Sequence, residues 1–204
     1  MNQREEYDRQ YRVWVERMGP AALDLEARLA GLIWRQRVLL RRFPPRGLRV
    51  LDFGCMDGVF TIALERAGAH AFGFDVSSAA IAQAVRFRGS ASGPEFSTTP
   101  PAEGEFDLVF CNEVIEHIAD DREFAGHLMS FLRPGGRLVG TTPVGRSFWD
   151  PDHKRLYDEA NLTAALAPWG QVRLRRYYRS PLRNLLPLRQ RGAAVFLFEV
   201  RRPG

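Results

Sequence analysis

The sequence contains few cysteines and no long hydrophobic run. Only Cys55 and Cys111 occur among its 204 residues, too few for a disulfide-stabilised fold and typical of a reducing compartment. The first residues are polar, and no apolar stretch approaches the roughly 20 residues that cross a membrane. Apolar residues make up 45% of the chain, enough for one core and short for two. We therefore expect one structural unit overall, with a cytoplasmic location.

Lysine is nearly absent, since Lys154 is the single lysine of the sequence whereas arginine occurs 28 times. The net charge of +5 arises at one end, since nine arginines and one acid lie from Gln171 onward. Such a general preference for arginine indicates codon bias more than selection for phosphate contacts. A nucleic-acid partner is therefore not favoured, although the basic carboxy-terminal segment leaves it open. Nothing in the pattern indicates the oligomeric state.

The two common phosphate-binding motifs are also missing, since the chain has neither G-x-G-x-x-G nor a P-loop. Instead, an apolar strand ending at Phe53 runs into a turn bounded by Gly54 and Gly58, and a helix is expected to follow. Such a turn lets a ligand approach the backbone. A second apolar strand ends at Asp75, whose carboxylate can bind both hydroxyls of a ribose. Together these features predict a site for a nucleoside cofactor without phosphates.

Four motifs then occur in order along the chain. They are Asp52-x-Gly54, Asp75, the segment from Phe106 to His117, and the segment from Leu132 to Leu138. In this order and spacing the chain resembles the class I S-adenosylmethionine (SAM) dependent methyltransferases over roughly residues 48 to 202. The segment from His153 to Tyr157 is similar to the small-molecule branch of that superfamily, the relatives of ubiquinone-biosynthesis and natural-product methyltransferases.

The sequence departs from that pattern in two places. Met56 occupies the middle of the first loop, where the family usually has glycine, so its side chain would have to point away from the cofactor. The span between the third and fourth strands lacks the usual acidic residue near the adenine. Only Ser97, Thr98 and Thr99, or the backbone, are available there.

From Leu48 onward strands alternate with helices, which predicts an α/β fold, a doubly wound, mostly parallel sheet of the Rossmann-like methyltransferase type. We expect strands near residues 48–53, 70–74, 95–98, 106–111, 136–142, 170–178 and 194–201, and helices near 58–67, 78–87, 121–132 and 158–167. Pro181 and Pro187 leave no room for a crossover helix, so the last strand should be antiparallel. Two further helical stretches are expected at 3–18 and 21–42, and the first carries an apolar stripe that includes Tyr7, Tyr11, Trp14 and Met18. The resemblance implies that they form a helical lid or cap over residues 1–47, followed by a SAM-binding domain over 48–204. The alternative is that the stripe simply packs on the core.

The resemblance implies a set of cofactor-binding residues. Asp75 would bind the ribose, the loop from Gly54 to Gly58 would face the methionine portion, and Asn112 would contact the amino-acid end through its backbone. The complete set comprises Asp52, Gly54, Cys55, Gly58, Phe60, Asp75, Val76 and Asn112.

Catalysis requires a group that takes a proton from the acceptor. His117 is the first candidate base, because an imidazole titrates near neutral pH, and His153 and Glu113 are further candidates. A structural role for each histidine remains open. If the segment from Glu113 is helical, Glu113, Glu116 and His117 share one face and could hold a divalent cation with His153. That arrangement resembles the metal site of small-RNA 3′-terminal 2′-O-methyltransferases, whereas the leading interpretation contains no metal.

The sequence thus predicts a SAM-dependent methyltransferase acting on oxygen or nitrogen of a small organic acceptor in a biosynthetic pathway. The alternatives are a metal-assisted RNA 2′-O-methyltransferase and a non-catalytic SAM-binding protein.

Overall fold

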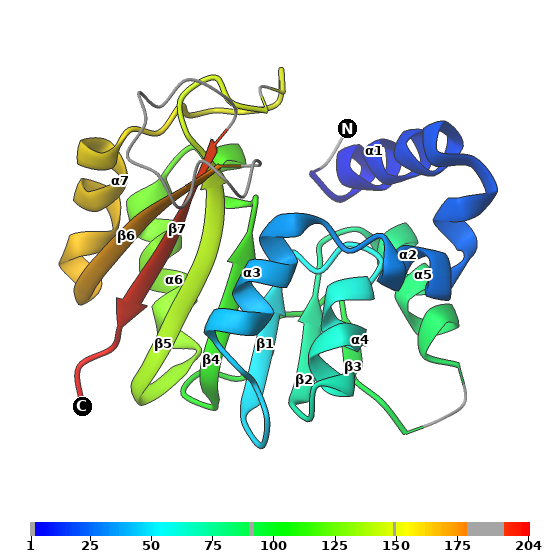
Figure 1. Cartoon of the computed structure of the whole chain (residues 1–204), viewed down its shortest axis with the longest axis horizontal. Coiled ribbons are helices and arrows are strands. Elements are labelled where there is room, and N and C mark those ends of the chain that lie inside the picture. Colours follow the sequence, from blue (N-terminus) through cyan, green and yellow to red (C-terminus); the bar gives the residue numbers. More distant parts are fainter. Residues whose placement is uncertain (1–2, 90–91, 149, 179–193) are drawn as a thin grey trace. The chain divides into compact units, whose positions relative to one another are not determined.

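A computed structural model describes residues 3–89, 92–148, 150–178 and 194–204. The chain divides into two compact units, Met1–Ala102 and Glu103–Gly204. Seven strands form a sheet in the order β3-β2-β1-β4-β5-β7-β6 (Figure 1). This confirms the expected doubly wound α/β fold, and the separate role of residues 1–47 stays a prediction. Within the described residues, no helix combines the length and apolarity that a membrane crossing requires.

The first unit contains three parallel strands and the helices that connect them. The elements are β1 (Arg49–Phe53), α4 (Val59–Arg66), β2 (His70–Phe74), α5 (Ser78–Arg88) and β3 (Glu95–Ser97). In β1, every residue after Arg49 is buried, which is the pattern of a parallel strand covered on both faces. Parallel pairing aligns Phe53 of β1 with Phe74 of β2, so the residues that follow the two strands emerge at the same edge.

The amino-terminal region forms three helices rather than two. After α1 (Gln3–Met18) come a 3₁₀ turn (Gly19–Leu23), α2 (Leu25–Ala30) and α3 (Trp34–Arg42). The expected helical stretch over 21–42 is therefore helical but is divided between α2 and α3. Asp24 starts α2 by accepting from the Ala27 N–H at 3.0 Å, and Gly31 ends it by donating its own N–H to the Ala27 carbonyl. The extended backbone of Ile33 then separates α2 from α3.

The second unit contains four strands, with helices α6 and α7. Its elements are β4 (Phe106–Asn112), a 3₁₀ turn (Ile115–His117), α6 (Asp121–Ser130), β5 (Leu132–Pro143), α7 (Glu159–Leu166), a second 3₁₀ turn (Ala167–Trp169), β6 (Gln171–Tyr178) and β7 (Ala194–Arg201). β7 pairs antiparallel with both β5 and β6, as predicted. β5 starts at Leu132, earlier than expected, because an irregularity in its pairing with β4 accommodates the Pro134–Gly136 segment.

Candidate active site

The loop of residues 54–58, here called the cofactor loop, joins β1 to α4 in the first unit. The N–H groups of Gly54 and Cys55 both donate to the Phe74 carbonyl, at 2.8 and 2.9 Å. Gly58 has φ of 72°, and a Cβ there would lie 2.5 Å from the Phe96 ring. Glycine is therefore required at position 58 both for its left-handed backbone and for the close approach of Phe96.

Met56 adopts the backbone conformation that glycine would adopt. Its φ is 53°, a left-handed value that costs a residue with a side chain roughly 1 to 2 kcal/mol. Its N–H donates to Asp75 Oδ2 at 2.8 Å. The replacement of glycine by methionine therefore leaves the loop in a glycine-like turn, and a hydrogen bond to the next strand end helps to hold it.

Asp75 lies directly after β2 and receives two backbone hydrogen bonds. Oδ2 accepts from Met56 and Oδ1 accepts from the Ser77 N–H at 2.9 Å. Burial raises the pKa of the Asp75 carboxyl, and the two backbone bonds oppose that rise. Each carboxylate oxygen can accept a second hydrogen bond, so two ribose hydroxyls could still be bound. The cap of α5 is Ser77, whose Oγ accepts from the Ala80 N–H, so Asp75 is not needed for that purpose.

Other residues expected at the cofactor have internal partners. Asp52 is 2% exposed and accepts from the Thr61 hydroxyl at 2.7 Å, and burial raises its pKa to about 7. Burial also raises the pKa of the Cys55 thiol. Phe60 is 3% exposed and belongs to the core, whereas Val76 is half-buried beside Asp75. Asp52 thus ties β1 to α4, and its contribution to the cofactor site would be indirect.

Two residues that the sequence analysis did not identify meet at this loop. Asp57, 2% exposed, forms an ion pair with Arg28 of α2 at 3.0 Å. The Arg28 guanidinium also lies 4.6 Å from the centroid of the Trp14 ring, and Trp14 stacks on Tyr11. Burial raises the pKa of Asp57, while Arg28 works to lower it. No local sequence pattern signals this pair, because its members lie 29 residues apart.

In the second unit, the chain leaves β4 through a left-handed residue. Glu113 has φ of 54°, and its N–H donates to the Thr141 carbonyl at 2.9 Å. Only Ile115–His117 are helical, in a single 3₁₀ turn. The helix from Glu113 that the metal alternative required is therefore absent from the described residues, and Glu113 does not share a helical face with Glu116 and His117. Both polar atoms of the Asn112 side chain are buried without a hydrogen-bond partner among the described residues, whereas its expected backbone contact stays a prediction.

The structure brings Glu116, His117 and His153 together. One ligand atom from each lies within 4.8 Å of the others, and the two imidazole rings meet edge to face with centroids 4.8 Å apart. Glu116 is 1% exposed and accepts from the Thr142 hydroxyl at 3.0 Å. Two imidazoles and a carboxylate can relay a proton, and they also match the donors of a divalent transition-metal site.

His117 is suited to accept a proton. Burial lowers the pKa of its imidazole, and the neighbouring His153 lowers it further, while a hydrogen bond to the backbone of Asp152 and the carboxylates of Asp150 and Asp152 work in the opposite direction. The net lowering keeps His117 neutral at pH 7. A neutral imidazole is the form that acts as a general base.

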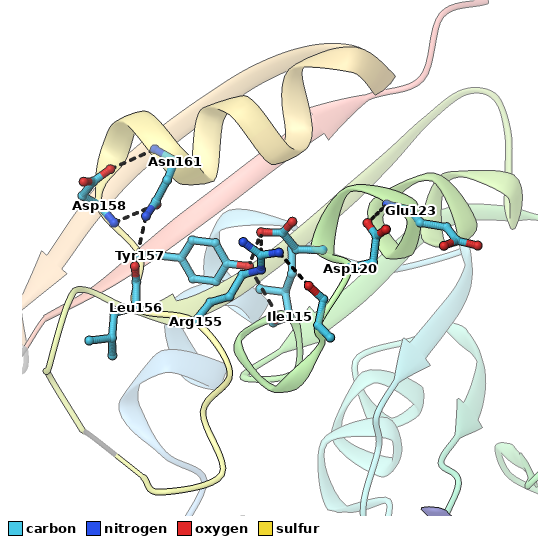
Figure 2. A network of polar contacts seen from close by, with 10 residues as sticks. Ile115, Asp120, Glu123, Arg155, Leu156, Tyr157, Asp158 and Asn161 are labelled. Carbon is cyan, nitrogen blue, oxygen red and sulfur yellow. Dashed lines mark hydrogen bonds and ion pairs between the residues drawn. The ribbon is translucent and has the colours of Figure 1, made fainter.

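The segment carrying His153 is fastened to the 3₁₀ turn and α6. The N–H groups of Lys154 and Arg155 donate to the Glu116 carbonyl at 2.8 and 3.2 Å. The second attachment is made by Tyr157 and Arg155, whose side chains Figure 2 labels. The hydroxyl of Tyr157, 1% exposed, donates to Asp121 at 2.9 Å, and Arg155 pairs with the same carboxylate at 3.2 Å. These contacts explain why His153 stays beside His117. Sequence reasoning missed Asp121, which resembles an ordinary residue of a first helical turn.

The model of a methyltransferase domain family matches residues 8–192. The chain belongs to this family. Among its curated relatives, the ubiquinone biosynthesis O-methyltransferase of Aromatoleum aromaticum is 35% identical over 112 residues, covering 50% of this chain and 46% of the relative. That of a Bradyrhizobium species is 38% identical over 102 residues, covering 47% and 40%. The chain thus matches about half or less of the length of these relatives.

Solved structures support the same fold. The chain is similar to magnesium protoporphyrin IX methyltransferase of Synechocystis, solved with bound S-adenosylhomocysteine (SAH), with a TM-score of 0.68 at 19% identity and coverage of 98% of this chain and 97% of that chain. A Haloferax volcanii methyltransferase in complex with the Trm112 activator gives a TM-score of 0.71 at 17% identity, with coverage of 100% and 98%. At these identities the likeness supports the fold alone.

Proposed function

We propose that this chain binds SAM through the cofactor loop and Asp75 and methylates an oxygen or nitrogen of a small organic acceptor in a biosynthetic pathway. The observation that carries the proposal is the loop itself, a glycine-like turn that is bonded to the half-buried carboxylate of Asp75. Membership of the methyltransferase family supports the reaction type. The O-methyltransferases among the relatives favour a hydroxyl as the acceptor group.

Asp75 and the cofactor loop would have separate roles in binding SAM. Bound SAM supplies a methyl group that is already activated on a sulfonium. Asp75 would accept hydrogen bonds from the ribose hydroxyls, because both of its oxygens retain acceptor capacity. Backbone groups of the cofactor loop would contact the methionine portion. Since the donor is activated, alignment of the acceptor and exclusion of water supply much of the acceleration.

A hydroxyl or ammonium acceptor must also lose a proton. We assign this role first to His117, whose lowered pKa leaves an imidazole nitrogen able to accept a proton at neutral pH. His153 lies against it and is the second candidate. Glu113 is the weakest of the three, because its left-handed backbone places it outside the cluster of Glu116 and the two histidines.

A second candidate for the same cluster is a divalent cation held by Glu116, His117 and His153. The proximity of the three ligand atoms supports it, and such an ion would lower the pKa of the acceptor hydroxyl. An RNA acceptor gains no support from the ubiquinone-biosynthesis relatives. The cytoplasmic location stays part of the proposal, and the buried thiols of Cys55 and Cys111 suit a reducing compartment.

Calorimetric titration tests the cofactor assignment. We expect SAM and SAH to bind and NAD not to bind, because the loop offers no pyrophosphate seat. Tight NAD binding without SAM binding would overturn the proposal. Binding of SAM without turnover on any acceptor would favour a non-catalytic SAM-binding protein instead.

A further inference from the structure

Asp8 of α1 binds the amino-terminal end of α5, although Asp8 and Ser77 lie 69 residues apart in the sequence. Its Oδ1 accepts from the Ser77 hydroxyl at 2.7 Å and from the Ala79 N–H at 2.9 Å. Its Oδ2 accepts from the Ser78 hydroxyl at 2.7 Å. One carboxylate from another helix therefore holds three donors of the segment that follows Asp75.

The charge of Asp8 is well placed for this contact. Partial burial works to raise the pKa of Asp8, but the Ala79 N–H and the two serine hydroxyls outweigh it, and the pKa is lowered overall. The first turn of a helix also favours an anion, because its N–H groups carry partial positive charge. Asp8 is therefore ionised at neutral pH and makes charge-assisted hydrogen bonds, which are stronger than neutral ones.

Ser77 links Asp8 to Asp75. The Ser77 hydroxyl donates to Asp8 and accepts from the Ala80 N–H, while the Ser77 N–H donates to Asp75 Oδ1. Asp75 Oδ2 is held by the cofactor loop at Met56. The position of the Asp75 carboxylate thus depends on two backbone donors, and one of them belongs to a residue that Asp8 anchors from outside α5.

We propose that Asp8 is a positioning residue for the cofactor: by anchoring Ser77 it holds the Asp75 carboxylate ready for the ribose hydroxyls. This rests on the proposed function, because it assumes that Asp75 binds the ribose. A carboxylate held in place before binding loses less conformational entropy when the ligand arrives, so the anchor tightens binding without touching the ligand. Docking of α1 and cofactor binding are then reciprocally linked.

The test measures the affinity of the purified full chain for SAH by calorimetry. Asp8→Ala should weaken SAH binding about tenfold, because three charge-assisted hydrogen bonds are lost at once. Asp8→Asn keeps one acceptor oxygen, so its affinity for SAH should lie between those of Asp8→Ala and the wild type. Ser78→Ala removes a single bond to Asp8 and should weaken binding about twofold to threefold, which provides a milder variant if Asp8→Ala does not fold.

Glu6→Ala is the matched control, because Glu6 is an acid on the same helix whose carboxylate accepts hydrogen bonds from Arg9 and Gln10 of α1 itself. It should bind SAH like the wild type, which separates the anchoring contact from the general charge of α1. Steady-state kinetics give a second readout. Asp8→Ala should raise the KM for SAM while the KM for the acceptor and kcat at saturation stay within about twofold of wild type.

The outcomes distinguish this inference from the proposed function. Wild-type affinity of a folded Asp8→Ala or Ser78→Ala chain overturns the positioning role alone. A fall in kcat with unchanged SAH affinity also overturns it. Failure of the wild-type chain to bind SAH overturns the cofactor assignment, and the positioning role with it.

Discussion

The Met56 N–H and the Asp75 Oδ2 lie 2.8 Å apart, and this bond joins the loop after β1 to the residue after β2. It explains how the chain accommodates a methionine where its family usually has glycine. The left-handed backbone of Met56 is retained, and part of its cost is offset by a hydrogen bond to a charged acceptor.

Replacement of Asp75 tests the ribose contact. Asp75→Ala should weaken the binding of SAM and SAH by roughly 1 to 3 kcal/mol through lost charge-assisted hydrogen bonds. Isothermal calorimetry measures the change, and Asp107→Ala, which removes a carboxylate paired with Arg133 in the second unit, is the control. Unchanged affinity of a folded Asp75→Ala chain would remove Asp75 from the cofactor site.

The Arg28–Asp57 pair should contribute to stability. Arg28→Ala leaves a carboxylate that is 2% exposed without its cation, so we expect the free energy of unfolding to fall by about 2 to 4 kcal/mol. Denaturant titration measures it, and adding Asp57→Asn should recover part of the loss. Arg66→Ala removes an exposed pair with Glu26 and should change little. Equal effects of the two arginine substitutions would contradict this account.

Removal of residues 1–18 tests the lid. Of the apolar stripe of α1, Tyr11 is buried, Trp14 is half-buried and Met18 is 45% exposed, so the stripe is not a full part of the core. The truncated chain should keep its fold, as measured by circular dichroism, and lose activity because water reaches the reacting groups. Outright unfolding would place the stripe in the core instead.

Asp52 should make stability depend on pH. Burial raises its folded-state pKa to about 7 from 3.8, so the folded chain binds the proton more tightly than the unfolded chain does. The resulting stabilisation is present at low pH and is lost as the pH rises from about 4 to 7. Relative to Asp52→Asn, the wild type should therefore lose about 2 to 4 kcal/mol of unfolding free energy across that window. Urea denaturation measures the unfolding free energies of both proteins at pH 5 and pH 8. If they change equally between the two pH values, Asp52 does not titrate in that range.

His117→Ala separates the base from the metal ligand. If His117 is the base, His117→Ala should lower kcat by about 10² to 10⁴ and leave the affinity for SAM nearly unchanged. Chelators should then have no effect on activity. The wild-type rate should then fall only below the ordinary imidazole pKa of about 6.5, because burial lowers the pKa of His117.

For a metal site, Glu116→Ala and His153→Ala should match the loss caused by His117→Ala, and added Mg²⁺ or Mn²⁺ should control activity. Glu123→Ala serves as the control, because Glu123 is exposed on α6 and does not belong to the cluster. Full activity of His117→Ala would leave this histidine structural.

The sequence predicted those features that have a local cause. Alternating strands and helices produced the sheet, and the spacing of Gly54 and Gly58 predicted the turn that the structure shows. It did not show which single residues interrupt a helix, such as Gly31, which ends α2, and Glu113, whose left-handed φ excludes the helix that the metal alternative required.

Contacts between distant segments were also missed. Arg28 and Asp57, like Asp8 and Ser77, meet only after folding, and neither pair shows a periodicity or a motif. The metal alternative placed His153 beside His117, as the structure does, but the bond between Tyr157 and Asp121 that fastens the segment of His153 was not predicted.

Transfer of a labelled methyl group from SAM tests the central claim most directly. The full chain would be incubated with labelled SAM and a panel of small phenols, carboxylic acids and amines, with RNA oligonucleotides in parallel. The account predicts label in a low-molecular-weight oxygen or nitrogen acceptor. Label found only in RNA, or no transfer to any acceptor by a chain that binds SAM, would contradict it.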